Sequence, residues 1–190
     1  MSEIAVITGG TSGIGRATAL YLREAGYTVY ELSRREQGVE GLHHIRCDIT
    51  DEDQVRAAVA EIIGQAGRID VLINNAGFGI SGAVEFTDTA EAQRLLDVNF
   101  FGMVRMNKAV IPHMRQAGRG RIGRSVQRME HDEQTGMDPA KAGAFIARVA
   151  MKRRPKPVYT IRLDYQFFVF LTRILPGRTL NWLIGLLYAR

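Results

Sequence analysis

A glycine-rich run directly follows the first apolar segment of the chain and leads straight into an amphipathic one. The run reads Thr8-Gly9-Gly10-Thr11-Ser12-Gly13-Ile14-Gly15. Where side chains are absent, a phosphate can approach backbone N–H groups at the N-terminus of a helix, whose dipole favours negative charge. Gly9 would permit the tight turn, Gly13 the approach of a pyrophosphate, and Gly15 the packing of helix on strand. A flexible turn would also explain the glycines, but the strand–turn–helix context favours a dinucleotide site.

The predicted elements that would position this run alternate regularly between strand and helix. As far as about residue 122, short β-branched segments alternate with longer amphipathic ones, a pattern typical of βαβ units and a parallel sheet. Four strands are predicted: Ile4–Thr8, Tyr27–Ser33, His44–Cys47 and Val71–Asn74. Three helices are predicted: Gly13–Ala25, a second running from a Thr50/Asp53 capping box to Ala66, and Glu91–Gln116. We therefore expect the α/β class with a Rossmann-type, doubly wound parallel sheet.

This alternation of strand and helix ends after Ile122. The segment Gly123–Gly136 is charged and contains no strand-like run, so we expect the sheet to be incomplete after the fourth strand, with order 3-2-1-4. The Val71–Asn74 strand would then be an open edge or would pair with Val158–Leu163. Asp138-Pro139 predicts the start of a helix that runs to about Arg153. We interpret residues 1–122 as a dinucleotide-binding region and 123–190 as a C-terminal helical or lid remnant of the same domain.

Three further motifs follow the glycine-rich run in order: Asp48-Ile49-Thr50, Asn74-Asn75-Ala76-Gly77 and Val98-Asn99-Phe100-Phe101-Gly102. Together the four motifs, all within residues 1–122, resemble those of the short-chain dehydrogenase/reductase family. The resemblance implies an NAD(P)(H)-binding oxidoreductase that transfers hydride between an alcohol and a carbonyl, with a small-molecule substrate. It implies that Asp48 bonds the adenine and that Asn99 belongs to the active site. The implied cofactor-binding residues are Thr8, Gly9, Thr11, Ser12, Gly13, Ile14, Gly15, Ser33, Arg34, Asp48, Ile49, Asn75, Ala76 and Gly77.

The end of the second strand bears on the choice of cofactor. NAD-dependent Rossmann domains place an acid there to bind the ribose 2′-hydroxyl, whereas NADP-dependent ones place an arginine near the 2′-phosphate. Ser33 falls at the position of the acid and Arg34 follows it, which favours NADP(H). Glu31, two residues earlier, keeps NAD(H) open.

The proton-transfer pair of the family, Tyr-x-x-x-Lys, is missing. None of the six tyrosines has a lysine four residues later. Met137 precedes Lys141 at that spacing, but a thioether carries no transferable proton, and Ser125 lies in a charged stretch unlike the serine-bearing strand of the family. We interpret Gly120-Arg121-Ile122 as the start of an interrupted fifth strand, with the segment bearing Ser, Tyr and Lys deleted.

That deletion would leave Asn99 as the remaining catalytic residue and the enzyme catalytically impaired. Two alternatives stay open. The first is a reductase that uses an unrecognised acid such as Tyr159. The second is a non-catalytic remnant that binds nucleotide or a protein partner, in which an exposed sheet edge would support association or a homo-oligomer.

Composition excludes several other classes. The net charge is +5, but the basic clusters at 115–128 and 152–156 lack the interleaved aromatics of a single-strand binder, so we expect no nucleic acid. Cys47 is the single cysteine and the histidines are scattered, which argues against a disulfide or a metal site. The first strand starts too early for a leader and the late apolar runs are short, so we expect a cytoplasmic protein without a transmembrane segment.

Overall fold

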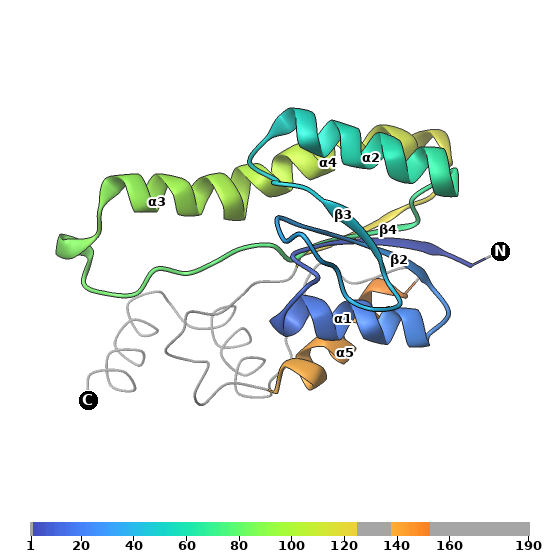
Figure 1. Ribbon diagram of the computed structural model, residues 1–190, viewed down its shortest axis with the longest axis horizontal. Coiled ribbons are helices and arrows are strands. Elements are labelled where there is room, and N and C mark those ends of the chain that lie inside the picture. Colours follow the sequence, from blue (N-terminus) through green and yellow to red (C-terminus); the bar gives the residue numbers. More distant parts are fainter. Residues whose placement is uncertain (1, 125–137, 153–190) are drawn as a thin grey trace, which may run out of the picture. The chain divides into compact units, whose positions relative to one another are not determined.

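A computed structural model describes residues 2–124 and 138–152 of the chain. Parallel strands form one sheet in the order β3-β2-β1-β4-β5 (Figure 1). The strands are β1 (Ile4–Thr8), β2 (Thr28–Ser33), β3 (His43–Arg46), β4 (Val71–Asn74) and β5 (Arg121–Arg124). The predicted α/β class with a Rossmann-type parallel sheet is therefore confirmed.

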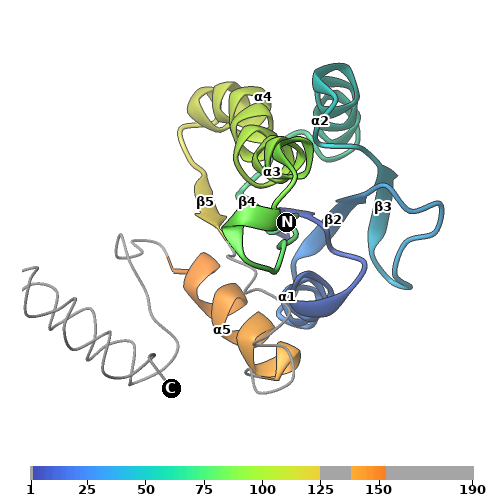
Figure 2. The same ribbon diagram turned by 90° about the vertical axis from the view of Figure 1, so that its left-hand side faces the viewer.

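Helices cover both faces of this sheet. They are α1 (Gly13–Glu24), α2 (Glu52–Ala66), α3 (Thr89–Leu96), α4 (Met103–Gln116) and α5 (Pro139–Ala150). Figure 2 shows α1 and α5 on one face and α2 and α4 on the other. In β1, Ala5 and Ile7 belong to the core beneath α1 and α5, whereas Ile4 and Val6 belong to the core beneath α2 and α4. The strand is continuously apolar because it is buried on both faces.

A fifth strand corrects the expectation that the sheet ends at β4. The order 3-2-1-4 is confirmed, but Val71–Asn74 is neither an open edge nor free for another strand, since Leu72 is in register with Ile122 of β5. The sequence marks only the start of this strand, because Arg121 and Arg124 break the apolar pattern. The guanidinium of Arg121 donates to Glu3 Oε2 (2.7 Å) and to the carbonyl of Met151 (3.1 Å). The interpretation of Gly120–Ile122 as the start of a fifth strand is confirmed. Val158–Leu163 lies outside the described residues.

The helix boundaries bring two further corrections. The N-cap of α2 is Asp51, not Thr50: its carboxylate accepts from the backbone N–H of Asp53 (2.9 Å) and Gln54 (3.1 Å). The helix predicted at Glu91–Gln116 is interrupted by a π-helical segment, Asp97–Gly102, between α3 and α4. Single π-helical turns inside α-helices occur frequently at functional sites.

The start of α5 agrees with the sequence. Asp138 Oδ1 accepts from the backbone N–H of Ala140 (2.9 Å), and Pro139 occupies the first turn. Gly143 lies against Ala17 and Thr18 of α1, so α5 packs on the sheet domain. Its role as part of a lid stays a prediction, because most of 123–190 lies outside the described residues. Within the described ranges, no helix combines the length and the apolar character needed to cross a membrane.

Candidate functional site

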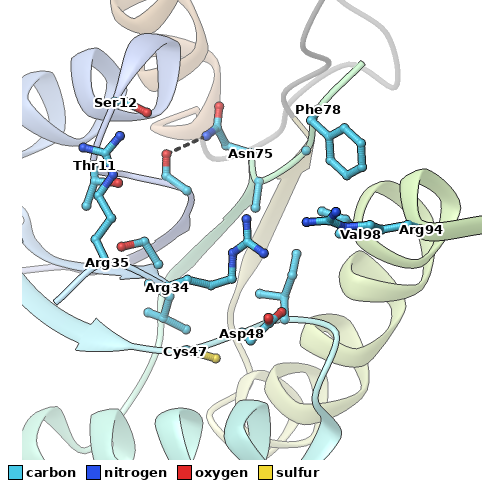
Figure 3. Close-up of a pocket in the computed structure, with 16 residues that line it drawn as sticks. Thr11, Ser12, Arg34, Arg35, Cys47, Asp48, Asn75, Phe78, Arg94 and Val98 are labelled. Atoms are coloured by element: carbon cyan, nitrogen blue, oxygen red, sulfur yellow. Dashed lines mark hydrogen bonds between the residues drawn. The ribbon is translucent and has the colours of Figure 1, made fainter. Parts of the chain in front are cut away.

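A cavity of about 760 Å³ opens beyond the carboxyl ends of the strands (Figure 3). In open α/β sheets, ligands bind at this edge. The cavity brings together most of the predicted cofactor residues, namely Gly9, Thr11, Ser12, Ser33, Arg34, Asp48, Ile49, Asn75, Ala76 and Gly77. The other predicted residues, Thr8, Gly13, Ile14 and Gly15, do not line the cavity and lie within or next to the turn that shapes it.

The turn from β1 into α1 forms one wall. Gly9 (φ 67°) and Gly13 (φ 53°) adopt left-handed backbone conformations that other residues rarely take. At Ser12, the N-cap, no side chain bonds the first turn of α1, and that turn carries no acidic residue. The helix N-terminus therefore keeps its partial positive charge for an anion.

Asn75 fixes this turn to the end of β4. Its Nδ2 donates to the carbonyls of Thr8 (3.0 Å) and Gly9 (3.0 Å), and its backbone N–H donates to the Thr8 hydroxyl (3.0 Å). A Cβ on Gly15 would lie 2.3 Å from that Nδ2. A buried brace, made of Thr8, Gly15 and Asn75, thus holds the shape of this side of the site.

The end of β2 supplies the cationic side of the cavity. Arg34 extends into the cavity in Figure 3, and both Arg35 and Ser33 line it. Glu31 does not line it: its carboxyl is buried and bonds to Nδ1 of His44. The structure therefore does not place Glu31 to bind the ribose: it lies two residues before Ser33 on the same face of β2, and its side chain is packed against Gly10 of the glycine-rich turn.

Asp48 and Cys47 complete the wall beneath the adenine position that the sequence predicts. One carboxylate oxygen of Asp48 accepts from the backbone N–H (3.0 Å) and the hydroxyl (2.8 Å) of Thr50. Burial raises the pKa of the Cys47 thiol to about 11, so the thiol stays protonated at neutral pH. Cys47 is therefore a small buried wall residue, as its sequence context predicts.

Asn99 lies in the π-helical segment and holds the loop after β4. Its Oδ1 accepts from the backbone N–H of Phe78 (3.0 Å), and its Nδ2 donates to the carbonyl of the same residue (2.8 Å). Asn99 does not itself line the cavity. The Asn99 amide thus fixes the backbone of Phe78, a residue that lines the cavity. The predicted catalytic role of Asn99 stays a prediction.

Sequence reasoning missed several lining residues, and some of them carried a usable signal. Val98 belongs to a motif, Phe78 directly follows one and Arg35 follows Arg34, so each could have been included. Arg94 could not, because no motif marks it; its guanidinium lies 5.8 Å from the centroid of the Phe78 ring, a cation–π distance. The missed residues are Leu32, Arg35, Cys47, Phe78, Arg94 and Val98. In the described part of the chain, no group of three His, Cys, Asp or Glu side chains is placed to hold a metal ion.

Comparisons with known proteins agree with this geometry. The model of the family described as short chain dehydrogenase matches residues 3–123. The 3-ketodihydrosphingosine reductase of Bacteroides thetaiotaomicron is 46% identical over 121 residues, which cover 63% of this chain and 45% of that protein. The chain spans less than half the length of this relative and of other curated relatives that it matches.

Solved structures show the same fold. ElxO with NADP bound has a TM-score of 0.63 and 26% identity, over 78% of this chain and 63% of that one. A short-chain dehydrogenase from Streptomyces avermitilis has a TM-score of 0.76 over 91% of this chain and 93% of that one. The identity to the second is 22%, so that likeness concerns the fold alone.

Proposed function

The chain belongs to the short-chain dehydrogenase family, and from that premise we propose that it binds NADP(H) in preference to NAD(H) as part of an oxidoreductase. The observation that carries the proposal is the side chain of Arg34, which extends from the end of β2 into the cavity beside the glycine-rich turn (Figure 3). The pyrophosphate would lie against the turn and the N-terminus of α1. The 2′-phosphate of the adenosine would then face Arg34 and Arg35.

The charges around the cavity support this choice of cofactor. Arginines 34, 35 and 94 line it, and Asp48 is the one acidic residue among its described lining. A ribose 2′-hydroxyl is bound best by an acid at the end of β2, but Ser33 occupies that position. A 2′-phosphate there meets planar guanidinium groups, which bind phosphate oxygens in a fixed geometry. The solved structure of ElxO with NADP bound agrees with this cofactor.

Arg34→Ala is expected to weaken NADPH binding by roughly tenfold or more while NADH binding stays unchanged. A hydrogen bond to a charged group contributes about 1.5–3 kcal/mol to binding. NADH has no 2′-phosphate, so its affinity does not depend on this bond. Titration calorimetry with both cofactors measures the two affinities. Arg56→Ala is a matched control, because it removes the same charge from an exposed position on α2. Equal losses for NADPH and NADH in Arg34→Ala would contradict the assignment of Arg34 to the 2′-phosphate.

The substrate that we propose is a small-molecule ketone or the corresponding alcohol. The name of the Bacteroides relative identifies that protein as a reductase of a keto compound, so keto sphingoid bases are a rational first class to assay here. A cytoplasmic location and the association of copies through the sheet edge stay predictions from the sequence.

A second candidate function is cofactor binding without turnover. It is favoured by the absence of the Tyr-x-x-x-Lys pair from the sequence. It is also favoured by Asn99, whose amide oxygen and nitrogen are both bonded to the backbone of Phe78. The turnover experiment described below separates the two functions.

A further inference from the structure

A buried acid and a histidine lie beneath the arginine side of the cavity. The side chain of Glu31 is 0% exposed and that of His44 is 18% exposed. Nδ1 of His44 bonds to Oε1 of Glu31, and Nε2 of His44 lies 3.0 Å from the backbone carbonyl of Arg35. The second carboxyl oxygen of Glu31, Oε2, has no hydrogen-bond partner among the described residues.

Two protons are needed if both of these contacts are to be hydrogen bonds at the same time. A carbonyl oxygen only accepts, so the bond to Arg35 requires a proton on Nε2 of His44. The bond between Nδ1 and Glu31 requires a second proton, on either the ring or the carboxyl. Both bonds form together only when the pair holds one proton more than an ionised glutamate beside a neutral histidine, and this proton would belong to the pair as a whole. Burial raises the pKa of the Glu31 carboxyl above its ordinary value against the opposing effect of His44, which agrees with a retained proton.

Losing that proton would break one of the two bonds. A neutral imidazole has one N–H, so it donates either to Glu31 or to the carbonyl of Arg35. If Nε2 keeps the proton, the lone pair on Nδ1 faces the carboxylate and repels it. If Nδ1 keeps the proton, the segment that carries Arg34 and Arg35 loses its hydrogen bond to His44 of β3.

The pair also touches the glycine-rich turn. A Cβ on Gly10 would lie 2.7 Å from Cβ and 3.5 Å from Oε2 of Glu31, so the carboxyl is packed directly against the turn. A phosphate bound at this turn would increase the negative charge near Glu31 and favour the protonated pair. The buried acid is thus placed between the two parts of the site that would bind phosphate groups.

The charged neighbours come from three elements. Arg35 is the cation next to the pair on the loop after β2 and favours the ionised carboxylate. Farther out on that loop, Glu36 is paired with Arg46 of β3 at 2.9 Å. From α1, Arg23 donates to the backbone carbonyl of Glu40 (3.1 Å). Both of these contacts lie on the exposed side of the loop.

We propose that Glu31 and His44 are positioning residues for NADP(H): their shared proton holds the Arg34–Arg35 segment in place, and cofactor binding and retention of that proton favour one another. The inference rests on the proposed function, because it assigns the 2′-phosphate to this segment. NADPH should depend on the pair more than NADH does.

The experiment measures NADPH and NADH affinities of the full chain by calorimetry from about pH 7.5 to about pH 9.5, where the 2′-phosphate stays fully ionised. The preference for NADPH over NADH is expected to fall roughly two- to tenfold as pH rises, the value of one neutral hydrogen bond. In His44→Asn, the preference should be low throughout and independent of pH. His43→Asn is the matched control, since its ring is exposed and stacks on Tyr30 at 4.7 Å from centroid to centroid; it should behave like the parent.

A measurement on the unmodified chain guards against a variant that fails to fold. NADPH titrations in two buffers of different ionisation enthalpy give the number of protons taken up on binding. Uptake of part of a proton in the alkaline range is expected, and zero uptake would overturn the inference. A pH-independent preference in the parent, or an unchanged pH dependence in His44→Asn, would overturn it as well. If neither cofactor binds at any pH, the proposed function fails too, whereas binding with a constant preference defeats this inference alone.

Discussion

Concentrated protein supplied with NADPH and a panel of ketones and aldehydes is expected to show no turnover above background, even when the cofactor is bound. Bound NADPH supplies a hydride donor in the site, but reduction of a carbonyl also needs a proton at the developing alkoxide. General acid catalysis typically supplies about 10²–10⁴ in rate. The sequence has no Tyr-x-x-x-Lys pair to deliver that proton, and an amide such as that of Asn99 does not titrate near neutral pH.

The missing proton donor and a missing wall of the substrate pocket would both slow the same step, the reduction of the carbonyl. The predicted deletion would remove one wall of the substrate pocket, and orientation of the reactants is worth up to roughly 7–11 kcal/mol of the barrier in favourable cases. The measurement follows NADPH absorbance, with a catalytically complete member of the family as the positive control. Turnover that disappears in Tyr159→Phe would show that the C-terminal region supplies an acid, and the expectation of an inactive chain would then be wrong.

Gly15→Ala is expected to destabilise the fold by about 1–3 kcal/mol, the range of an overpacked core position, and to weaken NADPH binding by more than about tenfold. The added Cβ would lie 2.3 Å from both Nδ2 of Asn75 and the carbonyl oxygen of Gly9. Neither atom can move freely, because Asn75 bonds the carbonyls of Thr8 and Gly9. Relief of the clash must therefore displace the turn against which the pyrophosphate would lie.

Gly64→Ala is the matched control for this substitution. Gly64 lies within α2, and a Cβ there would meet nothing within 4 Å. Alanine in place of a mid-helix glycine should therefore raise stability by roughly 0.5–1 kcal/mol and leave NADPH binding unchanged. Urea unfolding and calorimetry on both variants give the two quantities. If Gly15→Ala matched the parent in both, the brace around Asn75 would not be needed for the site.

The strands that sequence reasoning located are those with strong apolar patterns. Ile4–Thr8 and Val71–Asn74 were predicted with the bounds that the structure has, because buried central strands must be apolar on both faces. The strand at Arg121–Arg124 gave no such pattern. It pairs through its backbone with β4, and the guanidinium of Arg121 is satisfied by groups distant in sequence, which a local pattern does not reveal.

The residues of the candidate site also divide into those that a local sequence pattern reveals and those that it does not. Residues in motifs, such as Gly9, Asp48 and Asn75, line the cavity as expected. Arg94 was missed, because no motif marks it and only the tertiary structure places α3 beside the cavity. The role of Glu31 was misjudged for a related reason: its partner His44 is thirteen residues away on the neighbouring strand, and the pairing of β2 with β3 brings the two together.

The packing around Glu31 also limits the order in which this region can change over evolution. A Cβ on Gly10 would meet Glu31 at 2.7 Å, and a Cβ on Gly38 would meet the side chain of His44 at 2.3 Å. A side chain at either glycine therefore becomes tolerable only after the acid or the histidine has been replaced by something smaller. The reverse order passes through an overpacked intermediate, which is expected to be less stable by about 1–3 kcal/mol. A chain that keeps the buried pair is thus expected to keep both glycines, because of packing alone and independently of catalysis.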